Sequence, residues 1–286
     1  MGDFKSPIFH FYKQIKLFTC TNKFLYISHM LLTLLEILLK IGECNMFKNS
    51  KRIYLFLLIL FFSISTLFYL KHKQEISLFI ELGIDSYNTS KGLHKIKKLN
   101  KPVVTFFGGS RIPKNDFYYI QAEKLASLLA DKGFVIMSGG GPGIMEAANS
   151  GAIKNMKNKE EIRSISANLH LLTNFERSSN PSQLKFLHDK FWSRKLLLIN
   201  NSNAFIVFPG GTGTINELSE LLVLMEIGAL AKKTIILFDS KYWKKFIDWM
   251  NFAKTKNLIS QKAFDLILIK NNIEEIFNCL IKENSH

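Results

Sequence analysis

Residues 101–286 predict an α/β fold, in which helices cover both faces of a parallel β-sheet. From Pro102 onward, short apolar runs alternate with segments of helical spacing. This alternation is typical of βαβ units, whose right-handed crossovers place successive strands in one parallel sheet. Two glycine-rich stretches, SGGGPGIME (138–146) and FPGGTGTINE (208–217), each follow an apolar run and lead into a helical segment. We therefore expect a Rossmann-like, doubly wound sheet that binds ligands beyond the carboxyl ends of its strands.

The expected strands and helices follow one another along the chain. Apolar runs predict strands at 103–107, 134–138, 162–169, 204–208, 234–239 and 263–269. Helical spacing predicts helices at 116–133, 144–156, 184–200, 215–230, 242–254 and 273–281. The first of these helices ends at a glycine, which is the residue most often found just after a helix. No repeat or low-complexity segment interrupts the alternation.

The first hundred residues predict three further segments. Residues 1–45 form an extension with an apolar helix. Residues 46–73 contain the stretch 53–70, which carries no charge and is flanked by basic residues. They predict a transmembrane or signal-anchor helix, at the lower length limit for a span. A buried core helix and a hairpin of two apolar helices are the alternatives. Residues 74–100 are rich in lysine and predict a linker.

Charge and cysteine content indicate which binding partners and which cellular compartment to expect. The net charge is +15, but no run of five like charges and no zinc-finger spacing occurs. Such a charge indicates attraction to anions rather than sequence reading, so we expect no nucleic-acid partner. The cysteines are few and far apart, at Cys20, Cys44 and Cys279. This predicts a reducing compartment without a disulfide framework.

Both glycine-rich stretches predict contacts with a phosphate group. Glycine lets the backbone turn tightly and lets its N–H groups approach an anion, and the start of the next helix adds positive partial charge. The spacing fits neither of the common nucleotide-binding motifs. The third glycine of G-x-G-x-x-G is missing from the first stretch, and PGGTGT has no lysine for a P-loop.

A glutamate follows each glycine-rich loop, and the local pattern leaves its role open. Thr214 and Glu217 fit a capping box at a helix start, and Glu146 can complement a helix dipole. Alternatively, both glutamates act in one site. From the local pattern alone, Arg194 and His188 are surface or loop residues.

Three segments together resemble a known family. GGGPGIMEAAN (139–149), FWSRK (191–195) and PGGTGTINE (209–217) are similar to the motifs of the LOG family. These "Lonely Guy" proteins are cytokinin riboside 5′-monophosphate phosphoribohydrolases, often mislabelled as lysine decarboxylases. The signature PGGxGTxxE is complete in the third segment. FFGGSR (106–111) resembles the family's first phosphate-side loop, although the usual order is nearer FGSAR. The resemblance covers about residues 101–280.

The resemblance implies hydrolysis of the N-glycosidic bond of a nucleoside 5′-monophosphate, which yields a free base and ribose 5-phosphate. Glu217 would bind ribose hydroxyls and act in catalysis, because a carboxylate can stabilise oxocarbenium-like charge or direct water. Arg194 would serve the base, its leaving charge or the phosphate. The substrate-binding residues implied by the motifs are Gly109, Ser110, Gly140, Gly141, Glu146, Lys195, Gly210, Gly211, Thr212, Gly213 and Thr214.

The resemblance also implies a homodimer that needs no metal or cofactor. A loop with Glu176 and Asn180 resembles the longer bacterial branch of the family. The base that is released stays open, and adenine, an N6-modified adenine and a wider set all fit. We expect a membrane-anchored protein, held through 53–70, with its catalytic domain facing the cytoplasm. A soluble cytoplasmic protein is the alternative.

Three other functions compete with hydrolysis. Because fold does not determine function, the domain could be a non-catalytic carrier of a nucleotide or cofactor. The intact Glu217 and Arg194 speak against this. A decarboxylase using pyridoxal phosphate would need a Schiff-base lysine, and Lys195 is the only lysine within a family motif. The third is a membrane-anchored scaffold that only senses AMP.

Overall fold

The computed structural model describes residues 48–170 and 181–284, of which residues 48–58 are described by their backbone alone. The chain divides into two compact units, Met1–Ser77 and Leu78–His286. The apolar helix predicted within residues 1–45 lies outside the described residues.

The described part of the first unit is helical. It contains α3 (Lys48–Lys71) and the beginning of α4 (Lys73–Lys97). The predicted membrane anchor over 53–70 is not supported, because no helix in the described part of the chain is both long and apolar enough to cross a membrane. Side chains are described only from Ile59 of α3 onward.

The second unit is built on a parallel sheet, which has seven strands within the described residues, in the order β4-β3-β2-β1-β5-β6-β7. The strands are β1 (Val103–Phe107), β2 (Val135–Ser138), β3 (Ser164–Leu169), β4 (Leu184–His188), β5 (Ala204–Val207), β6 (Thr234–Phe238) and β7 (Ile267–Lys270). All neighbouring strands pair in parallel. The predicted doubly wound sheet is therefore confirmed. Its order reverses between β1 and β5, and the carboxyl ends of these strands form the switch point.

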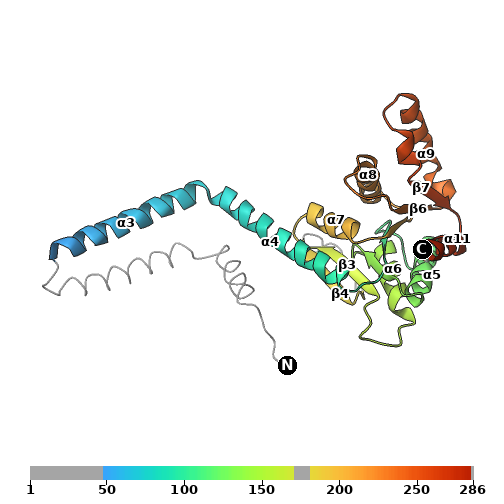
Figure 1. Ribbon diagram of the computed structural model, residues 1–286, viewed down its shortest axis with the longest axis horizontal. Helices are drawn as coiled ribbons and strands as arrows, with labels where there is room; N and C mark the ends of the chain where they lie inside the picture. The colour runs from blue at the N-terminus through green and yellow to red at the C-terminus, as the bar shows by residue number, and fades with distance from the viewer. Residues whose placement is uncertain (1–47, 171–180, 285–286) are drawn as a thin grey trace. The chain divides into compact units, whose positions relative to one another are not determined.

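Helices cover both faces of this sheet (Figure 1). Besides the end of α4, the helices of this unit are α5 (Phe117–Asp131), α6 (Ile144–Lys154), α7 (Phe191–Asn200), α8 (Thr212–Glu226), α9 (Ser240–Thr255), α10 (Gln261–Phe264) and α11 (Ile273–Asn284). Buried side chains of α5, α6 and α11 pack on one face of the sheet. Those of α4, α7, α8, α9 and α10 pack on the other.

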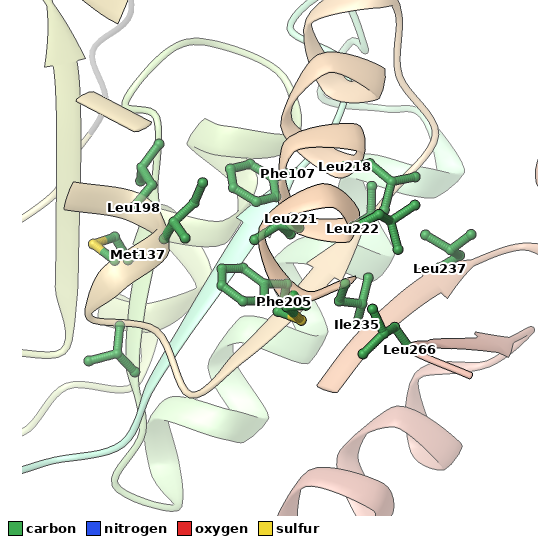
Figure 2. Packing of buried hydrophobic residues seen from close by; sticks show 14 of the residues in the cluster. Phe107, Met137, Leu198, Phe205, Leu218, Leu221, Leu222, Ile235, Leu237 and Leu266 are labelled. Carbon is green, nitrogen blue, oxygen red and sulfur yellow. The ribbon is translucent and has the colours of Figure 1, made fainter. Parts of the chain in front are cut away.

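The strands bury apolar side chains on both faces because both faces are covered. Val103 and Phe107 of β1 pack in one core cluster. Val104 and Phe106 of the same strand pack in the other. Figure 2 shows the first cluster, in which the rings of Phe107 and Phe205 stack with their centroids 6.1 Å apart. Full burial of such a side chain contributes about 1.5–3 kcal/mol to the free energy of unfolding.

Two predicted elements are wrong over part of their length. The helix predicted at 184–200 begins only at Phe191, and β4 occupies its first part. Both ends of β4 are buried while the residues between them are more accessible, as in an edge strand with a period of two. The strand predicted at 263–269 begins only at Ile267, because α10 occupies its first part.

The segment predicted as a linker, 74–100, is a helix that packs on the sheet domain. From Leu78 onward, α4 belongs to the same compact unit as the sheet. Its buried residues recur at helical spacing on one face and are Asp85, Thr89, Gly92 and Ile96. At Gly92 the helix lies so close to α7 that an added Cβ would stand 2.9 Å from Cδ1 of Leu197. The lysines that suggested a linker occupy the remaining faces of this helix.

Candidate functional site

Three loops meet at the switch point of the sheet. The N–H of Gly109, after β1, donates to the carbonyl of Pro209, after β5, at 2.9 Å. The N–H of Ile144, at the start of α6, donates to the carbonyl of Gly109 at 3.1 Å. The structure thus brings the two glycine-rich stretches side by side, joined through the loop of Gly109 and Ser110. Because both backbone groups of Gly109 connect loops, they are not free to hold a substrate.

Two glycines allow this close approach of the loops. Gly143 has a φ of +66°, which favours glycine, and an added Cβ would overlap with the carbonyl of Gly109. An added Cβ on Gly210 would overlap with Oγ1 of Thr214 and stand 2.8 Å from the backbone nitrogen of Gly109. Larger residues at these positions would separate the loops.

The start of α8 offers backbone N–H groups to an anion. Gly211 is the N-cap residue, and no side chain caps the helix. The N–H groups of Thr212, Gly213 and Thr214 precede the first helical bond, from the N–H of Ile215 to the carbonyl of Gly211 at 3.1 Å. Such groups have no partner within their own helix. An added Cβ at Gly211 or Gly213 would meet nothing within 4 Å, so the space beside them is open. A phosphate group would bind favourably here.

Two side chains support this loop. Thr214 is buried, and its Oγ1 lies against Gly210. The hydroxyl of Tyr242, on α9, donates to the carbonyl of Gly210 at 2.5 Å. Sequence reasoning missed Tyr242, because nothing near it in the sequence connects it with the glycine-rich loop.

Glu217 lies in the second turn of α8. The capping box predicted from Thr214 and Glu217 is wrong, because the helix already begins at Thr212, with Gly211 as its N-cap. A capping box needs its glutamate in the first turn, three residues after the N-cap. The side chain of Glu217 is therefore not required to hold the helix start.

The carboxyl group of Glu217 is strongly desolvated, although part of the residue remains accessible. Burial raises the pKa of Glu217 to about 7, while the positive charges of Arg194 and Lys195 lower it and Glu220 raises it. A carboxyl that titrates near neutrality can be ionised at physiological pH and still accept a proton, as a general base does. Perturbed carboxyl groups of this kind concentrate at functional sites.

Arg194, near the start of α7, is buried rather than at the surface, with 6% of its area exposed. Its Nε donates to the carbonyl of Ala167 at 2.9 Å, and its Nη2 donates to the carbonyl of Gly139 at 3.1 Å. An added Cβ at Gly139 would overlap with the guanidinium group. The first glycine-rich loop therefore makes room for Arg194 and orients it at the same time.

The other charged residues predicted to bind substrate already have partners. Nζ of Lys195 forms an ion pair with Glu220 and donates to Oδ1 of Asn216 at 3.2 Å. Glu146 is buried in the first turn of α6 and accepts from Nζ of Lys114 at 2.8 Å. A substrate would have to share or displace these partners.

A network of hydrogen bonds among largely buried polar side chains supports the first glycine-rich loop. The N–H of Gly140 donates to Oγ of Ser138 at 3.1 Å, and its carbonyl accepts from Nδ2 of Asn168 at 3.2 Å. The hydroxyl of Ser138 also donates to Oδ1 of Asn149. Gly140 and Gly141, both predicted to bind substrate, are buried. The Asn149 at the end of GGGPGIMEAAN was part of the recognised pattern, but its role as a loop support was not predicted.

The remaining predicted positions add little to this site. His188 is buried at the end of β4, not at the surface as the local pattern suggested. Glu176 and Asn180 lie outside the described residues. Among the side chains that are described, no group of three or more His, Cys, Asp or Glu could hold a metal ion.

Comparison with known proteins agrees with the motifs. Residues 145–280 match the family model described as "Possible lysine decarboxylase". A cytokinin riboside 5′-monophosphate phosphoribohydrolase of Rhodococcoides fascians is 28% identical over 93 residues, which are 32% of this chain and 46% of the relative. A protein of the same name from Mycobacterium marinum is 20% identical over 154 residues, 54% of this chain and 80% of the relative. The chain thus spans about half of the first relative and most of the second. These matches confirm the resemblance to the LOG family.

Solved structures give a weaker likeness. The molybdenum cofactor binding protein of Rippkaea orientalis is 21% identical, with 65% of this chain and 98% of that chain covered and a TM-score of 0.47. A likeness at this level carries no argument about function.

Proposed function

We propose that the chain is a nucleotide N-glycosidase, which hydrolyses a purine or N6-modified adenine nucleoside 5′-monophosphate to the free base and ribose 5-phosphate. The observation that carries this proposal is Glu217, a desolvated carboxyl group with a pKa of about 7 that lies next to an open helix start. The relatives named as phosphoribohydrolases support the same type of reaction.

The start of α8 would bind the 5′-phosphate. The N–H groups of Thr212, Gly213 and Thr214 precede the first helical bond and lie beside open space. Glu217 is three to five residues further along the helix, which is about 5–8 Å at the helical rise per residue. A ribose ring attached to the bound phosphate would therefore extend along α8 toward this carboxylate.

Ionised Glu217 would then act on the ribose. As the bond from C1′ to the base breaks, positive charge develops on the ring, and a carboxylate beside it stabilises that charge. The same carboxylate can accept a proton from the attacking water, whose oxygen joins C1′ while the base leaves and takes up a proton from solvent. The proton on Glu217 then returns to solvent. Arg194 lowers the pKa of Glu217, which keeps part of the carboxylate ionised at neutral pH. Catalysis should therefore increase as the pH rises through about 7.

The homodimer implied by the family resemblance stays part of this proposal. Large apolar side chains are exposed on neighbouring helices, with Ile227 at the end of α8 and Trp249 and Phe252 on α9. Such residues are enriched at interfaces between protein chains. Light scattering on the purified chain would measure the mass of the assembly.

Product analysis by liquid chromatography tests the proposed reaction. The full chain would be incubated with AMP, isopentenyl-AMP, GMP and CMP, in parallel with the variant Glu217→Gln. We expect free base from the wild type and almost none from the variant, and the preferred substrate identifies the base.

One result would replace the proposal with the carrier or sensor function. If AMP binds with a measurable affinity but no base appears from any of the four nucleotides, the site holds nucleotides without cleaving them. Calorimetric titration of wild type and Glu217→Gln with AMP decides between binding and no binding.

A further inference from the structure

A buried carboxylate on α4 holds the start of α7. Asp85 has 1% of its area exposed, and it reaches across from a helix that sequence analysis predicted to be a linker. One carboxylate oxygen accepts from the N–H of Asp189 at 3.2 Å, and the other accepts from Oγ of Ser193. The N-cap residue of α7, Lys190, provides no side-chain cap. Asp85 thus connects the residues around the start of α7 to another helix.

These donors stabilise the charge of Asp85, and the charge of Lys190 also interacts with it. His188 is a further titratable residue nearby, with Nδ1 at 3.8 Å from Oδ1 of Asp85. Burial lowers the pKa of His188, and the charge of Arg194 lowers it further, although Asp85 and Asp189 raise it. Burial therefore disfavours the charged form of His188, and Thr89 also faces its ring. Two hydrogen bonds and the positive end of α7 offset the cost of burying the Asp85 charge.

Ser193 and Arg194 are adjacent in the chain, and their side chains are held by different parts of the molecule. Ser193 is bonded to Asp85, and the guanidinium of Arg194 is bonded to the carbonyls of Ala167 and Gly139. A shift of the first turn of α7 would have to move Arg194 relative to these carbonyls.

We propose that Asp85 is a positioning residue, which through Ser193 and the first turn of α7 sets the place of the Arg194 guanidinium. The segment 78–97 then helps to position a residue of the site, although it lies outside the residues that match the family model. The effect on catalysis rests on the proposed function, whereas the positioning of Arg194 does not.

Three variants of the full chain test this proposal. Asp85→Asn removes the charge and disturbs one hydrogen bond. Ser193→Ala changes no charge and removes the hydroxyl that contacts both Asp85 and the carbonyl of Lys190. Lys95→Gln is the control on the same helix, because Lys95 is exposed on α4, whereas Glu81 pairs with Lys190 at the start of α7 at 3.0 Å. The first readout is the ¹⁵N–¹H signal of the Arg194 Nε group, assigned by its loss in Arg194→Lys.

We expect this signal to shift or broaden in Asp85→Asn and Ser193→Ala and to stay in place in Lys95→Gln. An unchanged signal in the first two variants overturns the proposal. An equal change in all three also overturns it, since general loosening of α4 would then explain the result. This readout decides the matter even if the wild type releases no base.

If the wild type does release base, kinetics provide a second readout. We expect kcat for AMP to fall about 10–100-fold in Asp85→Asn and Ser193→Ala. KM should change by less than about twofold, because the start of α8 holds the phosphate. A displaced Arg194 lowers the pKa of Glu217 less, so the acid limb of the pH–rate profile should move to higher pH. Loss of thermal stability with kcat and the pH profile unchanged would contradict a positioning role.

Discussion

The two glycine-rich loops have the same layout in the sequence but opposite roles in the structure. The loop at 139–143 is packed against other parts of the protein and positions them, and we call it the frame loop. The carbonyl groups of Gly139 and Gly140 accept from Arg194 and Asn168, and the N–H of Gly140 donates to Ser138. Its glycines make room for side chains and for neighbouring backbone.

The second loop is open instead at 211–213, beyond Gly210, which packs against Gly109 and Thr214. Gly211, Thr212 and Gly213 are exposed, and an added Cβ on either of these glycines would meet nothing within 4 Å. A glycine-rich pattern therefore predicts a close approach of the backbone to another group. That group can belong to the protein itself or to a ligand. The difference between the loops suggests which variants should abolish activity, which should unfold the protein, and which should do neither.

The largest expected effect is on the reaction beside the open loop. Glu217→Gln should lower the rate of base release about 100–10,000-fold, since the amide can neither accept a proton nor balance charge on the ribose. Glu226→Gln, at the far end of α8, is the control and should keep the wild-type rate. Chromatography of the products measures both, and a Glu217→Gln rate within a few-fold of wild type would exclude Glu217 as a catalytic residue.

The second effect concerns the frame loop. Gly139→Ala places a methyl group on the guanidinium of Arg194 and 2.8 Å from the sulfur of Met145. Overpacking of a buried position should destabilise the fold by about 1–3 kcal/mol. Urea denaturation followed by circular dichroism measures the free energy of unfolding. Wild-type stability in this variant would mean that Arg194 moves easily and is not held as described.

The third effect is a stability that depends on pH. Because the pKa of Glu217 is about 7 in the folded state, above its value in an unfolded chain, the folded state binds this proton more tightly. Ionising the carboxyl therefore costs stability as the pH rises from about 4.5 to about 7. At pH values above this window, Glu217→Gln should be more stable than wild type by about 1–3 kcal/mol, and the difference should vanish near pH 4. Thermal melts across this pH range measure it, and a constant difference would show that Glu217 is not desolvated.

The smallest effect is expected in the open loop. Gly213 lies inside α8 with free space beside it, so Gly213→Ala should stabilise the fold by about 0.4–1 kcal/mol. The same methyl group stands where the phosphate would approach, and KM for AMP should increase. Urea denaturation and initial rates test the two parts separately. Destabilisation as large as that of Gly139→Ala would remove the distinction between the loops.

Local patterns predicted much of the sheet domain. The strands β1, β2, β5 and β6 lie within the predicted runs, because each is a continuous apolar segment buried on both faces. Edge strand β4 was missed, because its alternating residues merge with the helical spacing of α7. Helix α4 was missed as a packed element, because its buried face is made mostly of polar and small residues, Asp85, Thr89 and Gly92.

The amino-acid sequence by itself determined the parallel α/β sheet and the glycine-rich loops at the carboxyl ends of its strands, and its resemblance to the LOG family added Glu217 and Arg194 as candidate site residues. Burial periodicity and backbone freedom are local properties, so a linear pattern carries them. Only the tertiary structure decided which loop is open, how far the pKa of Glu217 rises, and that α4 packs on the sheet domain. Desolvation and hydrogen bonding depend on which distant residues meet, as Asp85 and Ser193 do across 108 positions of the chain.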